Sequence, residues 1–270
     1  MSSEIKVDTI SENTSANGVT IDSLGIKDGK VTNLMNATLS AADLGTGLHI
    51  KTGDSSVSSL SVSHDELIVE SDGNAGISIL GGTSNQVGIA FGDSGDSDVG
   101  RINYTHSDNV MRFINNGSEN MTINTDGEVT KSNQPAFSAR NNATQSNIDN
   151  NTLILFGAET FDIGSNFASD HTFTAPVTGK YQLNAMVRMD NLDSSGTWVA
   201  MTIQTSNRNY TMLNSASTLD TDSGYWTFTV TAVADLDAND TANVLFNKSG
   251  GSATGDAADG YAQFSGFLAC

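Results

Sequence analysis

Three aspartates lie close together in a glycine-bearing segment, and their carboxylates could bind calcium. Residues 92–98 read GDSGDSD and place Asp93, Asp96 and Asp98 at alternate or near-alternate positions. Calcium prefers oxygen ligands that flexible loops present. The segment lacks the glycine and terminal glutamate spacing of an EF-hand, and aspartate-rich turns between strands are common. A plain turn is therefore the simpler interpretation, and a calcium site is the alternative.

A second group of aspartates, Asp235, Asp237 and Asp240, lies near the C-terminal end of the sequence and allows the same two interpretations. Asp220 and Asp222 form a smaller pair of the same kind.

The residues that enzymes use for catalysis occur in no distinctive pattern. A glycosidase needs two carboxylates on opposite sides of a sugar, but 31 acidic residues make such a pair unavoidable by chance. No nucleophile elbow, phosphate-binding loop or dinucleotide fingerprint occurs. The histidines have no short metal-ligand spacing; they are His49, His64, His106 and His171. We expect no enzymatic activity, and calcium is the one cofactor that the residues suggest.

Aromatic side chains could present ring faces to a sugar, and the candidates are Trp198, Tyr210 and Trp226. Trp198 begins an apolar strand, where packing in a core competes with ligand binding.

The charge of the chain argues against two classes of partner. A formal net charge of −19 repels nucleic acid phosphates and anionic lipids. No apolar run approaches the roughly 18 residues that span a bilayer, and no basic segment followed by an apolar run opens the chain. We expect a soluble protein without a secretory signal. The single cysteine, Cys270, excludes an intramolecular disulfide; a small apolar residue is the simpler interpretation and a cross-link between subunits the alternative.

The elements that must position these residues are predicted to be strands. Apolar residues recur at a period of two, and glycine, serine, threonine, asparagine and aspartate are abundant, which is typical of all-β proteins. One short helix is predicted over residues 36–44. Short strands are predicted at residues 48–51, 60–62, 67–70, 77–80, 87–91, 101–104, 110–114 and 121–124.

These short strands carry only two or three apolar side chains each, too few to oppose the conformational entropy of a lone unit. Residues 47–130 are therefore predicted to form a β-rich repeat shaft that other copies of the chain stabilise, as an intertwined trimer. Residues 1–46 are predicted to be an attachment segment.

A linker is predicted at residues 131–135 (KSNQP), and a separate domain at residues 136–270. Longer strands are predicted there at residues 153–156, 171–174, 180–189, 198–204, 225–232, 242–247 and 261–269. In the strand at 180–189, Tyr181, Leu183 and Val187 fall on one face and Gln182 and Arg188 on the other. Such alternation indicates a half-buried strand of a sandwich about the size of a jelly roll.

Residues 136–270 resemble the jelly-roll domain of the C1q and tumour necrosis factor family. The resemblance rests on four segments in the family's order: 134–140 (QPAFSAR), 173–181 (FTAPVTGKY), 236–244 (LDANDTANV) and 264–268 (FSGFL). Two features depart from the family's pattern. Asn239 replaces a turn glycine, which is tolerable because asparagine accepts left-handed conformations, and residues 204–208 replace a usual Lys-Asn-Gly tripeptide.

The resemblance implies a homotrimer in which apolar and aromatic residues meet at a threefold axis. The residues it assigns to the core or the trimer contact are Phe173, Tyr181, Phe264, Phe267 and Leu268. It also favours calcium somewhat more at Asp235, Asp237 and Asp240, because related jelly rolls sometimes hold calcium near the axis.

Residues 1–129 resemble segments of structural and fibre proteins of the tailed phages of marine bacteria. The segments are 7–12, 16–22, 26–31, 44–50, 65–70, 91–96, 99–102 and 121–127. Together the two resemblances imply a homotrimeric virion fibre, on the tail or the capsid, whose N-terminal segment docks on other virion proteins. Its C1q-like knob would attach to a host-surface glycan or protein. The alternatives are a capsid decoration protein, a polysaccharide-degrading tailspike and, outside phages, a secreted C1q-like lectin.

Overall fold

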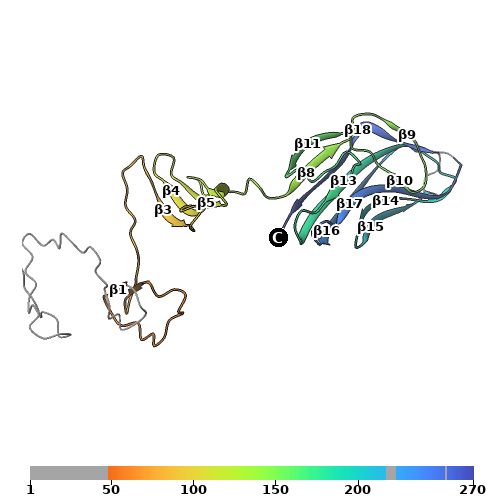
Figure 1. Ribbon diagram of the computed structural model, residues 1–270. Helices are drawn as coiled ribbons and strands as arrows, with labels where there is room; N and C mark the ends of the chain where they lie inside the picture. The colour runs from red at the N-terminus through yellow and green to blue at the C-terminus, as the bar shows by residue number, and fades with distance from the viewer. Residues whose placement is uncertain (1–47, 217–222, 253) are drawn as a thin grey trace, which may run out of the picture. The chain divides into compact units, whose positions relative to one another are not determined.

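The computed structural model describes residues 48–216, 223–252 and 254–270, and all its regular elements are strands (Figure 1). The predicted attachment segment, the predicted helix and the pair Asp220 and Asp222 lie outside these residues. The chain divides into two compact units, Met1–Ser78 and Ile79–Cys270. The part of the chain that the structure describes has no helix of the length and apolarity that a membrane crossing needs.

In the first unit, β1 (Leu48–Lys51) pairs in parallel with β2 (Leu67–Glu70), which confirms two predicted strands. The strands predicted at 60–62 and 77–80 are wrong. Val62 is 87% exposed and Leu80 is 89% exposed, and neither segment has a neighbouring strand to pair with. Apolar residues alone do not make a strand, because a strand needs a hydrogen-bonding neighbour.

The second unit begins with a five-stranded antiparallel meander. Its strands pair in chain order: β3 (Gln86–Phe91), β4 (Gly100–Thr105), β5 (Val110–Asn115), β6 (Ser118–Ile123) and β7 (Val129–Thr130). Four of these strands were predicted. Asn116 and Gly117 connect β5 to β6 with φ angles of 53° and 71°, and an Asn-Gly pair with two positive φ angles is the favoured tight hairpin turn.

Residues 131–135 connect β7 to a two-sheet sandwich. One sheet has the order β11-β8-β18-β13-β16, with β9 also on β18, and the other has the order β10-β17-β14-β15, with β12 also on β17. Most neighbours in each sheet are far apart in sequence, as Figure 1 shows for β8 beside β18. The strands are β8 (Ala136–Arg140), β9 (Gln145–Ile148), β10 (Thr152–Leu153), β11 (Ala158–Ile163), β12 (Phe173–Thr174), β13 (Gly179–Leu192), β14 (Gly196–Thr205), β15 (Asn209–Ser215), β16 (Ser223–Leu236), β17 (Thr241–Gly250) and β18 (Gly255–Leu268).

The core lies between these two sheets and is centred on stacked phenylalanines. Phe137 on β8 stacks on Phe173 at a centroid distance of 4.6 Å and on Phe167 at 5.1 Å, and Phe264 meets Phe137 edge-on at 5.0 Å. Along β13, buried and less buried residues alternate strictly from Tyr181 to Met189. The predicted half-buried strand is therefore confirmed.

Two turns place the strands around this core. Phe173 and Tyr181 lie on either side of the turn at 175–178 with their ring centroids 5.5 Å apart, and the Tyr181 hydroxyl donates a 2.7 Å hydrogen bond to the Val177 carbonyl. Between β16 and β17, Asn239 has a φ of 75°, so asparagine does adopt the left-handed conformation expected where the family has glycine.

Candidate interaction surfaces of the C-terminal sandwich

The two sheets of the sandwich differ in what they show to solvent. On the sheet that contains β13, six large apolar side chains point away from the core and are between 42% and 70% exposed. We call this surface the apolar outer face; its apolar residues are Phe161, Met186, Tyr225, Val233, Tyr261 and Phe267.

The outer face of the second sheet is polar by comparison. It carries mostly asparagine, threonine and glutamine side chains from β14, β15 and β17. Of the large apolar side chains that the structure describes on this face, Leu213 is 59% exposed and Leu155, just after β10, is 40% exposed. The apolar surface of the sandwich is therefore concentrated on one side.

Charged groups on the apolar outer face are neutralised by close partners. The Arg188 guanidinium forms two hydrogen bonds to the Asp190 carboxylate, at 2.7 and 2.8 Å, and lies over the Tyr261 ring at 4.3 Å from its centroid. The bonds from Arg188 hold the pKa of the Asp190 carboxyl below its usual range. Lys180 pairs with Asp235 on the same face at 2.5 Å. The face is nearly neutral although the chain as a whole is strongly acidic.

A polar network occupies the middle of the same face. The Gln182 amide donates to the Thr231 hydroxyl at 2.8 Å, and that hydroxyl donates to the Asn184 side-chain oxygen at 2.7 Å. These side chains form hydrogen bonds with one another across β13 and β16. Burial of the face would therefore leave few polar groups without a hydrogen-bond partner.

The residues predicted for the core or the trimer contact separate into two groups. Phe173, Tyr181 and Phe264 are fully buried in the sandwich, and Leu268 packs partly against that core. Phe267 points the other way, is 47% exposed and lies on the apolar outer face.

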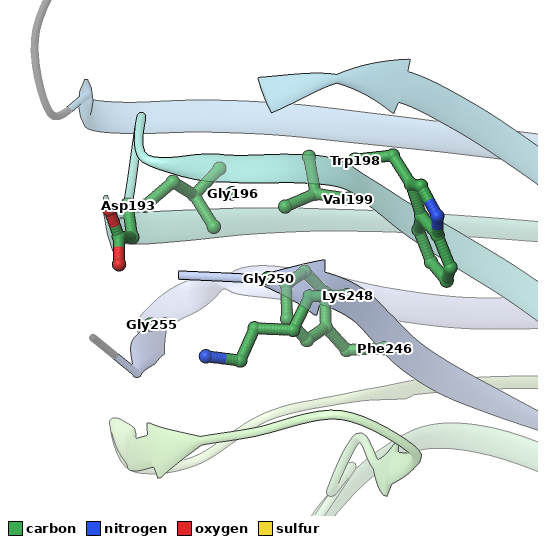
Figure 2. Close-up of a pocket in the computed structure, with 9 residues that line it drawn as sticks. Asp193, Gly196, Trp198, Val199, Phe246, Lys248, Gly250 and Gly255 are labelled. Carbon is green, nitrogen blue, oxygen red and sulfur yellow. The ribbon is translucent and has the colours of Figure 1, made fainter. Parts of the chain in front are cut away.

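Trp198, a predicted ligand-facing residue, lies opposite Ser215 and Ser249 in its sheet and lines a small cavity. The cavity has a volume of about 10 Å³ and is lined by Phe246, Lys248 and Leu192 among others. Figure 2 shows Trp198 and Asp193 at opposite ends of it, with the Lys248 side chain alongside. Such a volume holds about one water molecule and excludes a sugar ring.

Tyr210 lies at an open groove between β15 and β16, the facing edge strands of the two sheets. The groove has a volume of about 430 Å³, and its lining includes Thr211, Thr229 and Arg208, whose guanidinium is 5.7 Å from the centre of the Tyr210 ring. Trp226 is 39% exposed on β16 opposite Met189 and does not line this groove. The structure thus places the three predicted aromatic residues at separate locations.

The first group of predicted calcium ligands is arranged as a turn. The Asp93 carboxylate accepts hydrogen bonds from the backbone of Gly95 at 2.7 Å and of Asp96 at 3.0 Å, and these bonds lower its pKa. Asp96 caps the Asp98 backbone N–H at 3.0 Å, and Asp98 pairs with Arg101. Each carboxylate is thus engaged in a local interaction.

The second group is also engaged in local interactions. Asp240 accepts from the Asn207 amide at 2.6 Å and from the Asp237 backbone at 2.8 Å, while Asp235 pairs with Lys180. Within the described residues, no three His, Cys, Asp or Glu side chains converge to hold a metal ion. Calcium binding at either group stays a prediction.

The residues of the apolar outer face do not follow from the simple rule that an alternating strand carries apolar residues inside and polar residues outside. Val233, between the buried Ala232 and Ala234, and Tyr225, on the same strand, break that rule. A strand that carries apolar residues on both faces was the signal that could have found this surface.

Comparison with known proteins agrees with the resemblance seen in the sequence. The C1q domain family model matches residues 136–269. The globular domain of zebrafish complement 1qA protein is 20% identical, with a TM-score of 0.38 over 51% of this chain and 98% of that chain. Crystal structures of murine APRIL at pH 8.0 and pH 8.5 are each 13% identical, with a TM-score of 0.37 over 50% of this chain and 98% of those chains. No curated protein sequence matched the chain. The family model therefore identifies residues 136–269 as a C1q domain.

Proposed function

We propose that the chain is a homotrimeric binding protein whose C1q domains associate through the apolar outer face. C1q and TNF-like domains usually form trimers and typically serve as binding modules without enzymatic activity. The observation that carries the proposal is the difference between the two outer faces of the sandwich. Exposed aromatic and aliphatic side chains gathered on one face are typical of an interface, because their burial supplies most of the association free energy.

The electrostatics of the face support association between identical acidic chains. Each chain has a formal net charge of −19, so an interface with unpaired carboxylates would be repulsive. The ion pairs Arg188–Asp190 and Lys180–Asp235 neutralise charges on this face. Copies of the chain can therefore approach there without a large electrostatic cost.

Two matched variants test the proposal. Val233 is 58% exposed on the apolar outer face and Leu213 is 59% exposed on the opposite outer face. Val233→Asp should dissociate the trimer, because it buries a carboxylate at the interface, while Leu213→Asp should leave it intact. Light scattering after size-exclusion chromatography measures the mass, which should be three times 28.2 kDa for the wild type. A monomeric wild type would refute the assignment, and so would a Val233→Asp trimer that dissociates on dilution no more readily than the Leu213→Asp trimer.

We also propose that the trimer is a structural fibre of a bacteriophage virion, on the tail or the capsid. Residues 1–46 would attach to other virion proteins, and the C1q domain would bind a glycan or a protein on the host surface. The support is the resemblance of residues 1–129 to phage fibre segments, together with a C-terminal domain of a binding class. Electron microscopy of phage particles labelled with antibodies against residues 136–270 tests the location, and unlabelled particles would contradict it.

Two alternatives to a receptor-binding fibre make different experimental predictions. A polysaccharide-degrading tailspike would remove capsule or glycan from host cells when the pure protein is added. A capsid decoration protein would label particles but would not bind host cells. For the fibre we expect binding to cells without loss of their glycan.

A further inference from the structure

The meander of β3 to β7 is a single-layer sheet with one largely apolar face. Strand register places one set of side chains on the same side of all five strands. We call this side the meander face; its residues are Val87, Ile89, Phe91, Ile102, Tyr104, Met111, Phe113, Met121, Ile123 and Val129.

These side chains remain accessible in the single chain. Among the residues of β3 to β7, Asn103 is the buried one, and it lies on the opposite face. Phe91 is 56% exposed, Val129 54% and Ile89 50%. An apolar surface that crosses five strands is larger than a soluble protein usually leaves in water.

The opposite face has the composition of a solvated surface. Arg112 there bonds to Asp108 at 2.5 Å and to Glu119 at 2.9 Å, so charged groups pair along that side. Among the ten residues of the meander face, Tyr104 has the one ionisable group, and the His106 ring lies edge-on to it at a centroid distance of 5.1 Å. The sheet therefore has one side suited to water and one suited to burial.

The link to the C1q domain indicates what covers the meander face. This link between β7 and β8 consists of residues 131–135, and five residues span at most about 18 Å. Hydrogen bonds fix both of its ends: the Ser132 hydroxyl donates to the Glu119 carbonyl at 3.1 Å, and the Leu268 N–H donates to the Pro135 carbonyl at 2.9 Å. Copies of the meander that are tied so closely to associating domains meet at a high effective concentration, roughly millimolar for short linkers.

We propose that the meander faces of three copies of the chain pack against one another, about the same axis as the C1q domains, to form a three-sided β prism. The inference rests on the proposed trimer and adds a second interface to it. A second copy is the fitting occupant because the face has no carboxylate, so three acidic chains can bury it together without repulsion. Each sheet of the prism is then formed by the strands of one chain, so strands from different chains need not pair or intertwine.

Neighbouring residues on opposite faces of β6 provide a matched test in the full-length trimer. Met121 lies on the meander face and Thr122 on the polar face. In a Cys270→Ser background, Met121→Cys and Thr122→Cys are labelled with a nitroxide. Packed sheets lie about 10 Å apart, so we expect strong dipolar broadening between labels at position 121 and weak broadening at position 122. Equal broadening at both positions would overturn the prism.

The mass of the protein in solution distinguishes a failure of the proposed trimer from a failure of the prism alone. A monomer refutes the proposed trimer, whereas a trimer without broadening at position 121 refutes only the prism. A label at position 121 that is immobilised but not broadened would mean that another segment or protein covers the face, which also overturns it.

A second pair of variants tests the prism without a nitroxide label, which could itself disturb the packing. Ile102→Asp places three carboxylates inside the prism, and Thr122→Asp places them on its surface. We expect Ile102→Asp to raise amide hydrogen exchange in residues 86–130 at least tenfold with the trimer mass unchanged, and Thr122→Asp to leave exchange near that of the wild type. Unchanged exchange in Ile102→Asp would contradict the inference.

Discussion

Replacing Gly266 by alanine should destabilise the C1q domain although it adds a single methyl group. Gly266 on β18 is buried between β13 and β8. A Cβ atom there would lie 2.6 Å from Leu183 Cδ2, 2.9 Å from Phe137 Cε1 and 3.0 Å from the Gln182 carbonyl oxygen. The first two distances are shorter than the contacts of Cβ atoms in proteins and the third is tighter than most, so neighbouring side chains must shift. Overpacking of this kind costs about 1–3 kcal/mol.

Thermal and urea unfolding, followed by circular dichroism at one protein concentration, measure this cost. We expect Gly266→Ala to lower the midpoint by several degrees and Ser265→Ala, at the next position but facing outward, to change it little. Gly266→Asp should abolish the folded domain, and with it the proposed trimer, because it buries a carboxylate as well.

A double-mutant cycle with Leu183→Val tests the cause. Valine lacks the Cδ2 atom that the new methyl group would strike, so the loss from Gly266→Ala should be smaller in that background. A Gly266→Ala protein as stable as the wild type, or a loss that does not depend on residue 183, would refute the packing argument.

Three further predictions concern single interactions in the C1q domain. Arg188 lowers the pKa of the Asp190 carboxyl in the folded protein below its usual value near 3.8. The ion pair therefore stabilises the fold fully above about pH 3.8, and this stabilisation is lost as the pH falls through the lower pKa of the folded state. Urea titrations between about pH 5 and pH 2 should therefore show a smaller acid-induced loss of stability in Asp190→Asn than in the wild type. Asn239→Ala should cost about 1 kcal/mol in thermal unfolding and Asn239→Gly almost nothing, since the φ of 75° penalises a Cβ atom. Tyr181→Phe should cost about 1 kcal/mol in the same assay, because it leaves the Val177 carbonyl without its 2.7 Å donor; an unchanged midpoint would show that water replaces the hydroxyl.

The central strands of the sandwich could be predicted from the sequence because burial on one face imposes alternation on them. The strand from Tyr181 to Met189 and the closing strand around Phe264 are of this kind. The strands β9, β11 and β15 were not predicted. β11 and β15 end their sheets, and all three have few buried residues, so their sequences carry little periodic signal.

The surfaces were harder to predict than the core, because interfaces depend on which side of a sheet faces outward. The meander face could have been read from the alternation of Val87, Ile89 and Phe91, but its extent depends on the register of five strands. The location of Trp198 could not be predicted either. An aromatic residue at a strand start can point inward or outward, and only the packing around its cavity decides which.

The position of β18 between β8 and β13 has a consequence for the order of folding. Gln263 and Ser138, which bond across β18 and β8, are 125 positions apart in the chain. During synthesis β8 must wait for nearly the whole domain before its β18 neighbour exists, and such distant pairings fold slowly. Tyr261 and Phe267 of the apolar outer face lie on β18 itself. The apolar outer face is therefore complete only after β18 has paired with β8 and β13.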